Sequence, residues 1–396
     1  MKSTFLSKNN PYLPLFPAYG LYVVVWMMGT AWLPLLPQLV LLRGGSPAQA
    51  SATMAFAYFS QVLGNLGVGR FLKYRDVRSI AIGAALLLSA GTLLLGFAAA
   101  IPVFLFGILC AYGSFGALQP LVYQQIADVV LPEYQSRAFT ALSMLAAASA
   151  LLGALVLGGL AQATSHTAML QGCVIGGIIA LVLAFKMPHT TFTRKEISLG
   201  DAPSSGFWWL LTGTLFLAVA GFAGRILSPI LMTVQGFSAA PTASTMGIGG
   251  IASIPIALWL GRVARRNNAV IFLIIAHVVM GAALLCLLTA HQLGWFWLSS
   301  ALISIAFYSG IGLRPILLLQ WCDASQLGVL SGKLDAVANV GSIAGLLLAG
   351  PIYMKTGILN AGILFAIVSV ISIAALLPLL SARGMEEPPQ EAVALN

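Results

Sequence analysis

Residues 102–128 read PVFLFGILCAYGSFGALQPLVYQQIAD, and the first charge in this stretch is the final Asp128. A helix that crosses the hydrocarbon core of a bilayer needs about 20 apolar residues, so this stretch is long enough to span a membrane. The whole chain has a similar character, because 59% of its 396 residues are hydrophobic and only 7% are charged. An average soluble domain carries about 25% charged residues. The composition therefore predicts an all-α integral membrane protein.

Apolar stretches of this kind recur along the chain, and most are separated by short loops. We predict twelve transmembrane helices, at 12–42, 48–72, 77–99, 102–128, 136–162, 167–185, 207–235, 242–260, 269–290, 295–322, 329–353 and 358–380. A longer polar connection follows the sixth helix. The predicted organisation is a six-helix bundle at 1–185, a cytoplasmic linker at 186–206, a second six-helix bundle at 207–382 and a disordered cytoplasmic tail at 383–396.

The two predicted halves repeat each other in sequence. The segment GRFLK at 69–73 matches GRVAR at 261–265, and the segments 120–128 and 315–323 share Pro, Gln and Asp at the same spacing. Each match connects a helix of the first half to its counterpart in the second half. Internal repeats around a shared central site are typical of secondary transporters. We therefore expect two pseudo-symmetric bundles.

Positive charge is distributed unevenly between the two sides of the predicted bundle. Of the 19 Lys and Arg residues, fifteen fall on one side, and only Arg43 and Lys355 fall on the other. Cytoplasmic loops are the ones that carry this excess. We expect both termini to be cytoplasmic, in the inner (plasma) membrane of a bacterial-type cell. The net charge of +9 thus arises from membrane topology, and we expect no nucleic-acid partner.

Two loops carry a family resemblance that covers essentially the whole chain. Residues 126–138 (IADVVLPEYQSRA) are similar to the loop between helices 4 and 5 of the major facilitator superfamily, and residues 69–78 resemble its loop between helices 2 and 3. The chain departs from that second motif, because Lys73 stands where the family usually has Asp and Asp76 where it usually has Gly. The resemblance implies the fold of that superfamily, in which helices 1, 4, 7 and 10 line a central cavity.

The remaining two basic residues, Arg225 and Arg314, each lie inside an apolar segment. A charge at bilayer depth costs at least about 2.5 kcal/mol and marks a functional site by default. The sequence suggests no Asp or Glu deep in such a segment, so two unpaired guanidinium groups predict the binding of an anion. The alternative is structural, with each arginine bonding helix carbonyls or extending to the membrane surface.

Further candidates share helix faces that the resemblance turns toward the cavity. The predicted substrate contacts, besides Arg225 and Arg314, are Tyr22, Trp26 and Thr30 in helix 1, Tyr58 and Gln61 in helix 2, and Gln119 and Tyr123 in helix 4. Ordinary helix packing or an interfacial aromatic belt would also explain these residues. The predicted cytoplasmic gate consists of Lys73, Asp128, Arg265, Asp323 and Asp335.

These observations predict an alternating-access secondary transporter that moves a small organic anion, bearing a carboxylate or a phosphate, across the inner membrane. The alternative is an exporter of drugs or hydrophobic metabolites with the same fold, which could be proton-coupled. We expect a monomer in the lipid bilayer whose partner is a small-molecule substrate. We expect no enzymatic activity, no cofactor and no metal.

Overall fold

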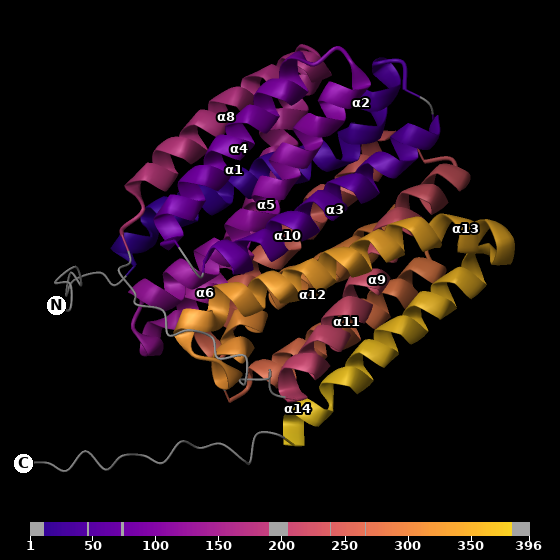
Figure 1. Cartoon of the computed structure of the whole chain (residues 1–396). Helices are drawn as coiled ribbons and strands as arrows, with labels where there is room; N and C mark the ends of the chain where they lie inside the picture. Colours follow the sequence, from indigo (N-terminus) through magenta and orange to yellow (C-terminus); the bar gives the residue numbers. More distant parts are fainter. Residues whose placement is uncertain are drawn as a thin grey trace, which may run out of the picture.

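The computed structural model describes residues 12–45, 47–72, 75–189, 205–237, 239–265 and 267–381. The first half of the chain forms α1 (Phe16–Trp32), α2 (Leu36–Leu42), α3 (Pro47–Phe71), α4 (Val77–Phe97), α5 (Ile101–Val129), α6 (Pro132–Leu152), α7 (Gly158–Ala163) and α8 (His166–Lys186). The second half forms α9 (Ser205–Val234), α10 (Ala239–Val263), α11 (Ala269–Leu288), α12 (Leu293–Trp321), α13 (Leu327–Leu376) and α14 (Pro378–Ser381). Figure 1 shows the halves side by side, coloured indigo to magenta and pink to yellow.

Short interruptions divide the longer spans without ending them. The 3-10 turn Leu33–Leu35 joins α1 to α2, and the π-helical turn Gly153–Leu157 joins α6 to α7. Helix α13 is two helices that meet at Gly357, whose φ of 77° is strained for residues with a side chain but not for glycine. The chain reverses there, so α13 crosses the bilayer twice.

The predicted fold class is confirmed. Within the described residues, nine helices are long and apolar enough to cross a membrane by length and composition. One of these nine is α13, which contains two spans and raises the number to ten. The less apolar helices α3 and α10 complete the set of twelve. The predicted domain boundaries at residues 185 and 207 stay a prediction, because residues 190–204 lie outside the described part of the chain. The tail from 383 onward lies outside it too.

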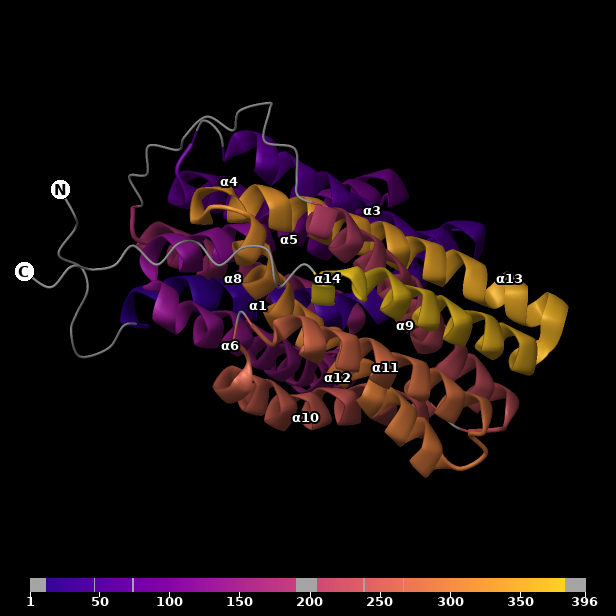
Figure 2. The ribbon, with the colours of Figure 1, turned by 90° about the horizontal axis from the view of Figure 1, so that it is seen from below.

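The two halves pack together through a few helices. Helices α3 and α5 of the first half lie against α13, and α6 lies against α10 and α12. Figure 2, turned by 90°, shows the same long helices running along one common direction. We call one end of the bundle the basic end, because α3, α5, α10 and α12 end there, close to Arg70, Arg75, Arg137, Arg262 and Arg265.

Hydrogen bonds between the halves concentrate toward the basic end. Ser136 donates to the carbonyl of Ala264 at 2.6 Å, which joins the start of α6 to the end of α10. Gln124 of α5 donates to the carbonyl of Ala324 at 2.9 Å, and its side-chain oxygen accepts from the backbone N–H of Gly328 at 2.8 Å. These contacts close the basic end of the interface.

Candidate functional site

Arg225 lies on α9, is partly buried, and sits over the ring of Phe222, which contacts Tyr58 of the first half. Its guanidinium carbon lies 4.5 Å from the centre of the Phe307 ring and 5.1 Å from that of Phe222. Among the described residues it makes no ion pair and no side-chain hydrogen bond. Two cation–π contacts of this kind stabilise the charge by about 0.5–2 kcal/mol each, depending on how far the group is desolvated. The polar edge of the guanidinium group is therefore left available to a ligand.

Aromatic side chains of the first half contact the two rings that lie against this guanidinium group. Tyr58 of α3 packs edge-on against Phe222, with ring centres 5.0 Å apart. Trp26 of α1 contacts Phe307 at 6.5 Å and Tyr308 at 6.2 Å. Of the residues that the sequence predicts on helix 1, Trp26 thus contacts the second half of the protein. Phe222, Phe307 and Tyr308 are absent from the predicted set, because neutral aromatic residues in an apolar span look like ordinary core.

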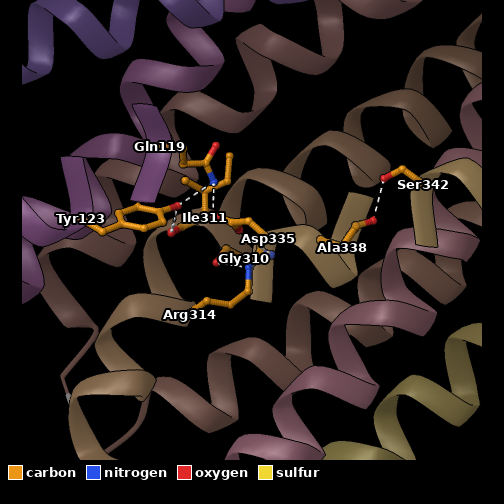
Figure 3. A network of polar contacts seen from close by, with 8 residues as sticks. All are labelled: Gln119, Tyr123, Gly310, Ile311, Arg314, Asp335, Ala338 and Ser342. Carbon is orange, nitrogen blue, oxygen red and sulfur yellow. Dashed lines mark hydrogen bonds and ion pairs between the residues drawn. The ribbon is translucent and has the colours of Figure 1, made fainter. Parts of the chain in front are cut away.

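Arg314 is not unpaired, which corrects the expectation from sequence. Its Nη1 lies 3.5 Å from Oδ1 of Asp335, with the two side chains only 12% and 10% exposed. Its Nε donates to the carbonyl of Gly310 at 2.9 Å, one turn earlier in α12 (Figure 3). The carboxylate also corrects the expectation that no Asp or Glu is deeply embedded. Asp335 is the ninth residue of α13, about 12 Å along that helix from its start, and faces α12 and α5.

The ion pair is tied to the first half of the protein by Gln119. Its side-chain nitrogen donates to Oδ2 of Asp335 at 3.0 Å and contacts the hydroxyl of Tyr123 at the same distance. Tyr123 in turn donates to the carbonyl of Ile311 at 3.2 Å. Figure 3 shows these side chains converging from α5, α12 and α13. The sequence predicts Gln119, Tyr123 and Arg314 as substrate contacts, and the described contacts bring them together around Asp335.

The remaining predicted contacts differ in what they offer to a ligand. The Thr30 hydroxyl donates to the carbonyl of Trp26 at 2.7 Å, so it is satisfied within its own helix. The Gln61 backbone packs closely against Gly116 of α5, which joins two helices of the same half. Tyr22 is 1% exposed, and its hydroxyl has no hydrogen-bond partner among the described residues. Its ring lies 5.9 Å from that of Trp26, on the same helix face.

The predicted gate is only partly visible. Lys73 lies outside the described residues. Asp128 accepts a hydrogen bond from Gln124 at 2.6 Å, which places it beside the closed interface. Arg265 is exposed and donates to the carbonyl of Ala264, and Asp323 is exposed at the start of a 3-10 turn. Asp335 belongs to the central ion pair and not to the basic end. Gln124, which joins the halves, was not predicted.

Asp76 has a structural role that accounts for one departure from the loop motif. It occupies the N-cap of α4, accepts from the backbone N–H of Ser79 at 3.4 Å and also binds the Ser79 hydroxyl. His189 lies 3.4 Å from its carboxylate. Partial burial raises the pKa of Asp76, but the hydrogen bonds from Ser79 outweigh burial and hold the pKa below its usual value. A glycine at this position could not cap the helix with a side chain.

Two pseudo-symmetric six-helix halves with a polar cluster between them define a multi-pass membrane transporter. The sequence model of the Major Facilitator Superfamily matches residues 18–316, and the chain belongs to that family. A search of curated proteins finds no match.

Solved structures share the fold. The human organic anion transporter MFSD10 (TETRAN) superposes with a TM-score of 0.77 at 15% identity, covering 91% of this chain and 98% of its own. The Major Facilitator Superfamily transporter FucP, in the outward conformation, gives a TM-score of 0.70 at 14% identity, covering 95% of this chain and 100% of its own.

Proposed function

We propose that this transporter moves a small organic anion across the inner membrane by alternating access. The observation that carries the proposal is Arg225, a cation between the two halves with no ion pair or side-chain hydrogen bond among the described residues. A guanidinium group binds carboxylate or phosphate oxygens in a fork and stays charged at any relevant pH. A substrate anion is therefore its natural partner.

The other predicted residues take supporting roles in this proposal. Trp26 and Tyr58 hold the organic body against the rings beside Arg225, while Tyr22 offers a hydroxyl without a partner. Gln119 and Tyr123 tie the ion pair of Asp335 to the first half. Thr30 on α1 and Gln61 on α3 belong to the helix faces that carry Trp26 and Tyr58, respectively. The solved structure of an organic anion transporter with this fold is in keeping with the proposal, although 15% identity shows the fold alone.

The topology and gate belong to the same proposal. The basic end faces the cytoplasm, since it carries the excess of positive charge. Closure of the basic end is controlled by Lys73, Asp128, Arg265 and Asp323. Asp335 lies deeper in the bundle and contributes through its hydrogen bond with Gln119, which joins the two halves. With the basic end closed, the described conformation is the outward-facing one. The two halves then rock around the central cluster during transport.

A second candidate is an exporter of drugs or hydrophobic metabolites. Two observations favour it: the aromatic residues around Arg225, and the embedded carboxylate of Asp335, which supplies a proton-binding group for coupling. A cationic drug, however, would meet the uncompensated charge of Arg225. We therefore rank anion transport first.

A thermal-shift screen of the purified protein tests the choice between them. Anionic, neutral and cationic metabolite sets are compared, because a ligand that binds only the folded state raises Tm by mass action. Stabilisation by anions that disappears in Arg225→Gln supports anion transport. Stabilisation by neutral or cationic compounds, retained in Arg225→Gln, supports the exporter instead.

A further inference from the structure

The central cluster contains two guanidinium groups and one carboxylate. The Asp335 carboxylate lies 3.5 Å from Arg314 and accepts a hydrogen bond from Gln119 at 3.0 Å, so Arg314 and Asp335 form an ion pair of opposite unit charges. The pair is therefore neutral as a unit, and Arg225 supplies the remaining charge. We infer that the site carries one net positive charge and takes a monovalent organic anion with an aromatic body, such as an aromatic monocarboxylate. This inference rests on the proposed function and narrows its substrate class.

The aromatic body follows from what surrounds the free guanidinium group. Phe222 and Phe307 lie against Arg225, and Tyr58 and Trp26 extend this surface into the first half. A carboxylate bound at Arg225 carries its substituent along these rings, where aromatic pairs favour offset or edge-on packing. A small anion such as acetate would leave the rings uncovered and gain little from them.

A second negative charge on the substrate would have no free partner. Phe307, which lies against Arg225, and Arg314 are seven residues apart, about 10 Å along α12. The charge of Arg314 is already compensated by Asp335. A dianion would leave one carboxylate desolvated without a cation, which is costly in an apolar setting. The ion pair thus acts as a selectivity element against divalent anions.

Four compounds test this inference: benzoate, terephthalate, acetate and benzylamine. They vary the charge of the ligand and the presence of an aromatic ring independently. Binding to the purified protein is measured by thermal shift and by calorimetry at one fixed pH. We expect benzoate to bind at least about tenfold more tightly than terephthalate, since one uncompensated charge separates them. We expect acetate to bind more weakly than benzoate, and benzylamine not to bind.

Two variants test the role of the ion pair. Asp335→Asn releases the charge of Arg314, so terephthalate should gain affinity relative to benzoate by at least about tenfold. The matched control is the double variant Arg314→Gln with Asp335→Asn, which restores one net charge and should restore the preference for benzoate. Should Asp335→Asn fail to fold, the comparison in the unaltered protein decides alone.

Each outcome bears on a different claim. Equal affinity for terephthalate and benzoate in the unaltered protein overturns the monoanion inference, and anion transport stands. Equal affinity for acetate and benzoate overturns the aromatic body, and absence of benzoate binding overturns the inference as stated. Binding of benzylamine together with no anion would overturn the proposed function itself.

Discussion

The two membrane-embedded arginines have different environments. Both are visible in the sequence as charges within apolar spans, and that part of the site could be predicted. The partner of Arg314 could not, because Asp335 lies in the second turn of the predicted span 329–353 and looks like a residue near a helix end. Which face of α13 meets α12 depends on packing between helices far apart in sequence. At the residue scale, Arg314 is paired with a carboxylate, whereas Arg225 is the ligand-binding residue of our proposal.

Removing Arg314 alone should destabilise the protein. Arg314→Gln leaves Asp335 as a buried carboxylate without its cation, and breaking a buried pair in this way costs about 3–5 kcal/mol. The double variant with Asp335→Asn should recover most of that loss, because no charge remains. The measurement is the Tm and the free energy of unfolding of the four proteins in a double-mutant cycle. An additive cycle would show that the 3.5 Å contact carries no coupling.

Arg225 should behave in the opposite way. Arg225→Gln removes a charge that has no ion pair among the described residues, so the unliganded Tm should stay the same or rise. Anion affinity should fall by about 2–5 kcal/mol if the bound charge pair is desolvated. Arg225→Lys keeps the charge but loses the forked geometry of the guanidinium group, so its anion affinity should lie between those of the unaltered protein and Arg225→Gln. Unfolding of Arg225→Gln, or normal anion binding by it, would assign this arginine a structural role.

At the scale of elements, the sequence predicts the lengths of the helices but not which helices contact one another. Apolar runs gave the spans to within a few residues, because bilayer thickness fixes how many apolar residues a helix needs. The break at Gly357 falls between the predicted spans 329–353 and 358–380. The contact of Gln124 with the start of α13 was missed, since a glutamine near a helix end has no pattern that reveals its partner.

Gly332 should control how closely the halves approach. A Cβ added there would lie 2.6 Å from the backbone oxygen of Asn65 on α3, in the other half. Gly332→Ala should destabilise the closed basic end by about 1–3 kcal/mol, the usual cost of overpacking. Spin labels at the exposed positions 133 and 262 should then report a longer or broader distance distribution across that end.

The matched control for this change is Gly350→Ala on the same helix. A Cβ at Gly350 meets nothing within 4 Å, so this substitution should leave the label distances unchanged. An unchanged distribution in Gly332→Ala would mean that the α3–α13 contact does not limit opening. A shift in both variants would point to a general effect of helix propensity in α13 and not to the interface.

At the scale of the whole molecule, the two halves and their repeat could be predicted, whereas the conformational state could not. The repeat predicts that corresponding helices of the two halves occupy corresponding positions. It does not indicate which end of the interface between the halves is closed. The described hydrogen bonds between halves break that symmetry, because they run from the central Gln119 to the basic end. Combined with the charge bias, this asymmetry makes the described state outward-facing in our proposal.

Membrane topology gives the last prediction, because it decides whether that state opens outward. Single cysteines are introduced at Glu133, exposed at the basic end, and at Thr164, exposed at the opposite end, in a background lacking the partly exposed Cys286 and Cys322. An impermeant maleimide on intact cells should label position 164 and reach position 133 only after permeabilisation. The excess of Lys and Arg on the basic side supplies the physical reason, since such loops are retained in the cytoplasm. Labelling of position 133 from outside would invert the topology, and the closed basic end would then describe an inward-facing transporter.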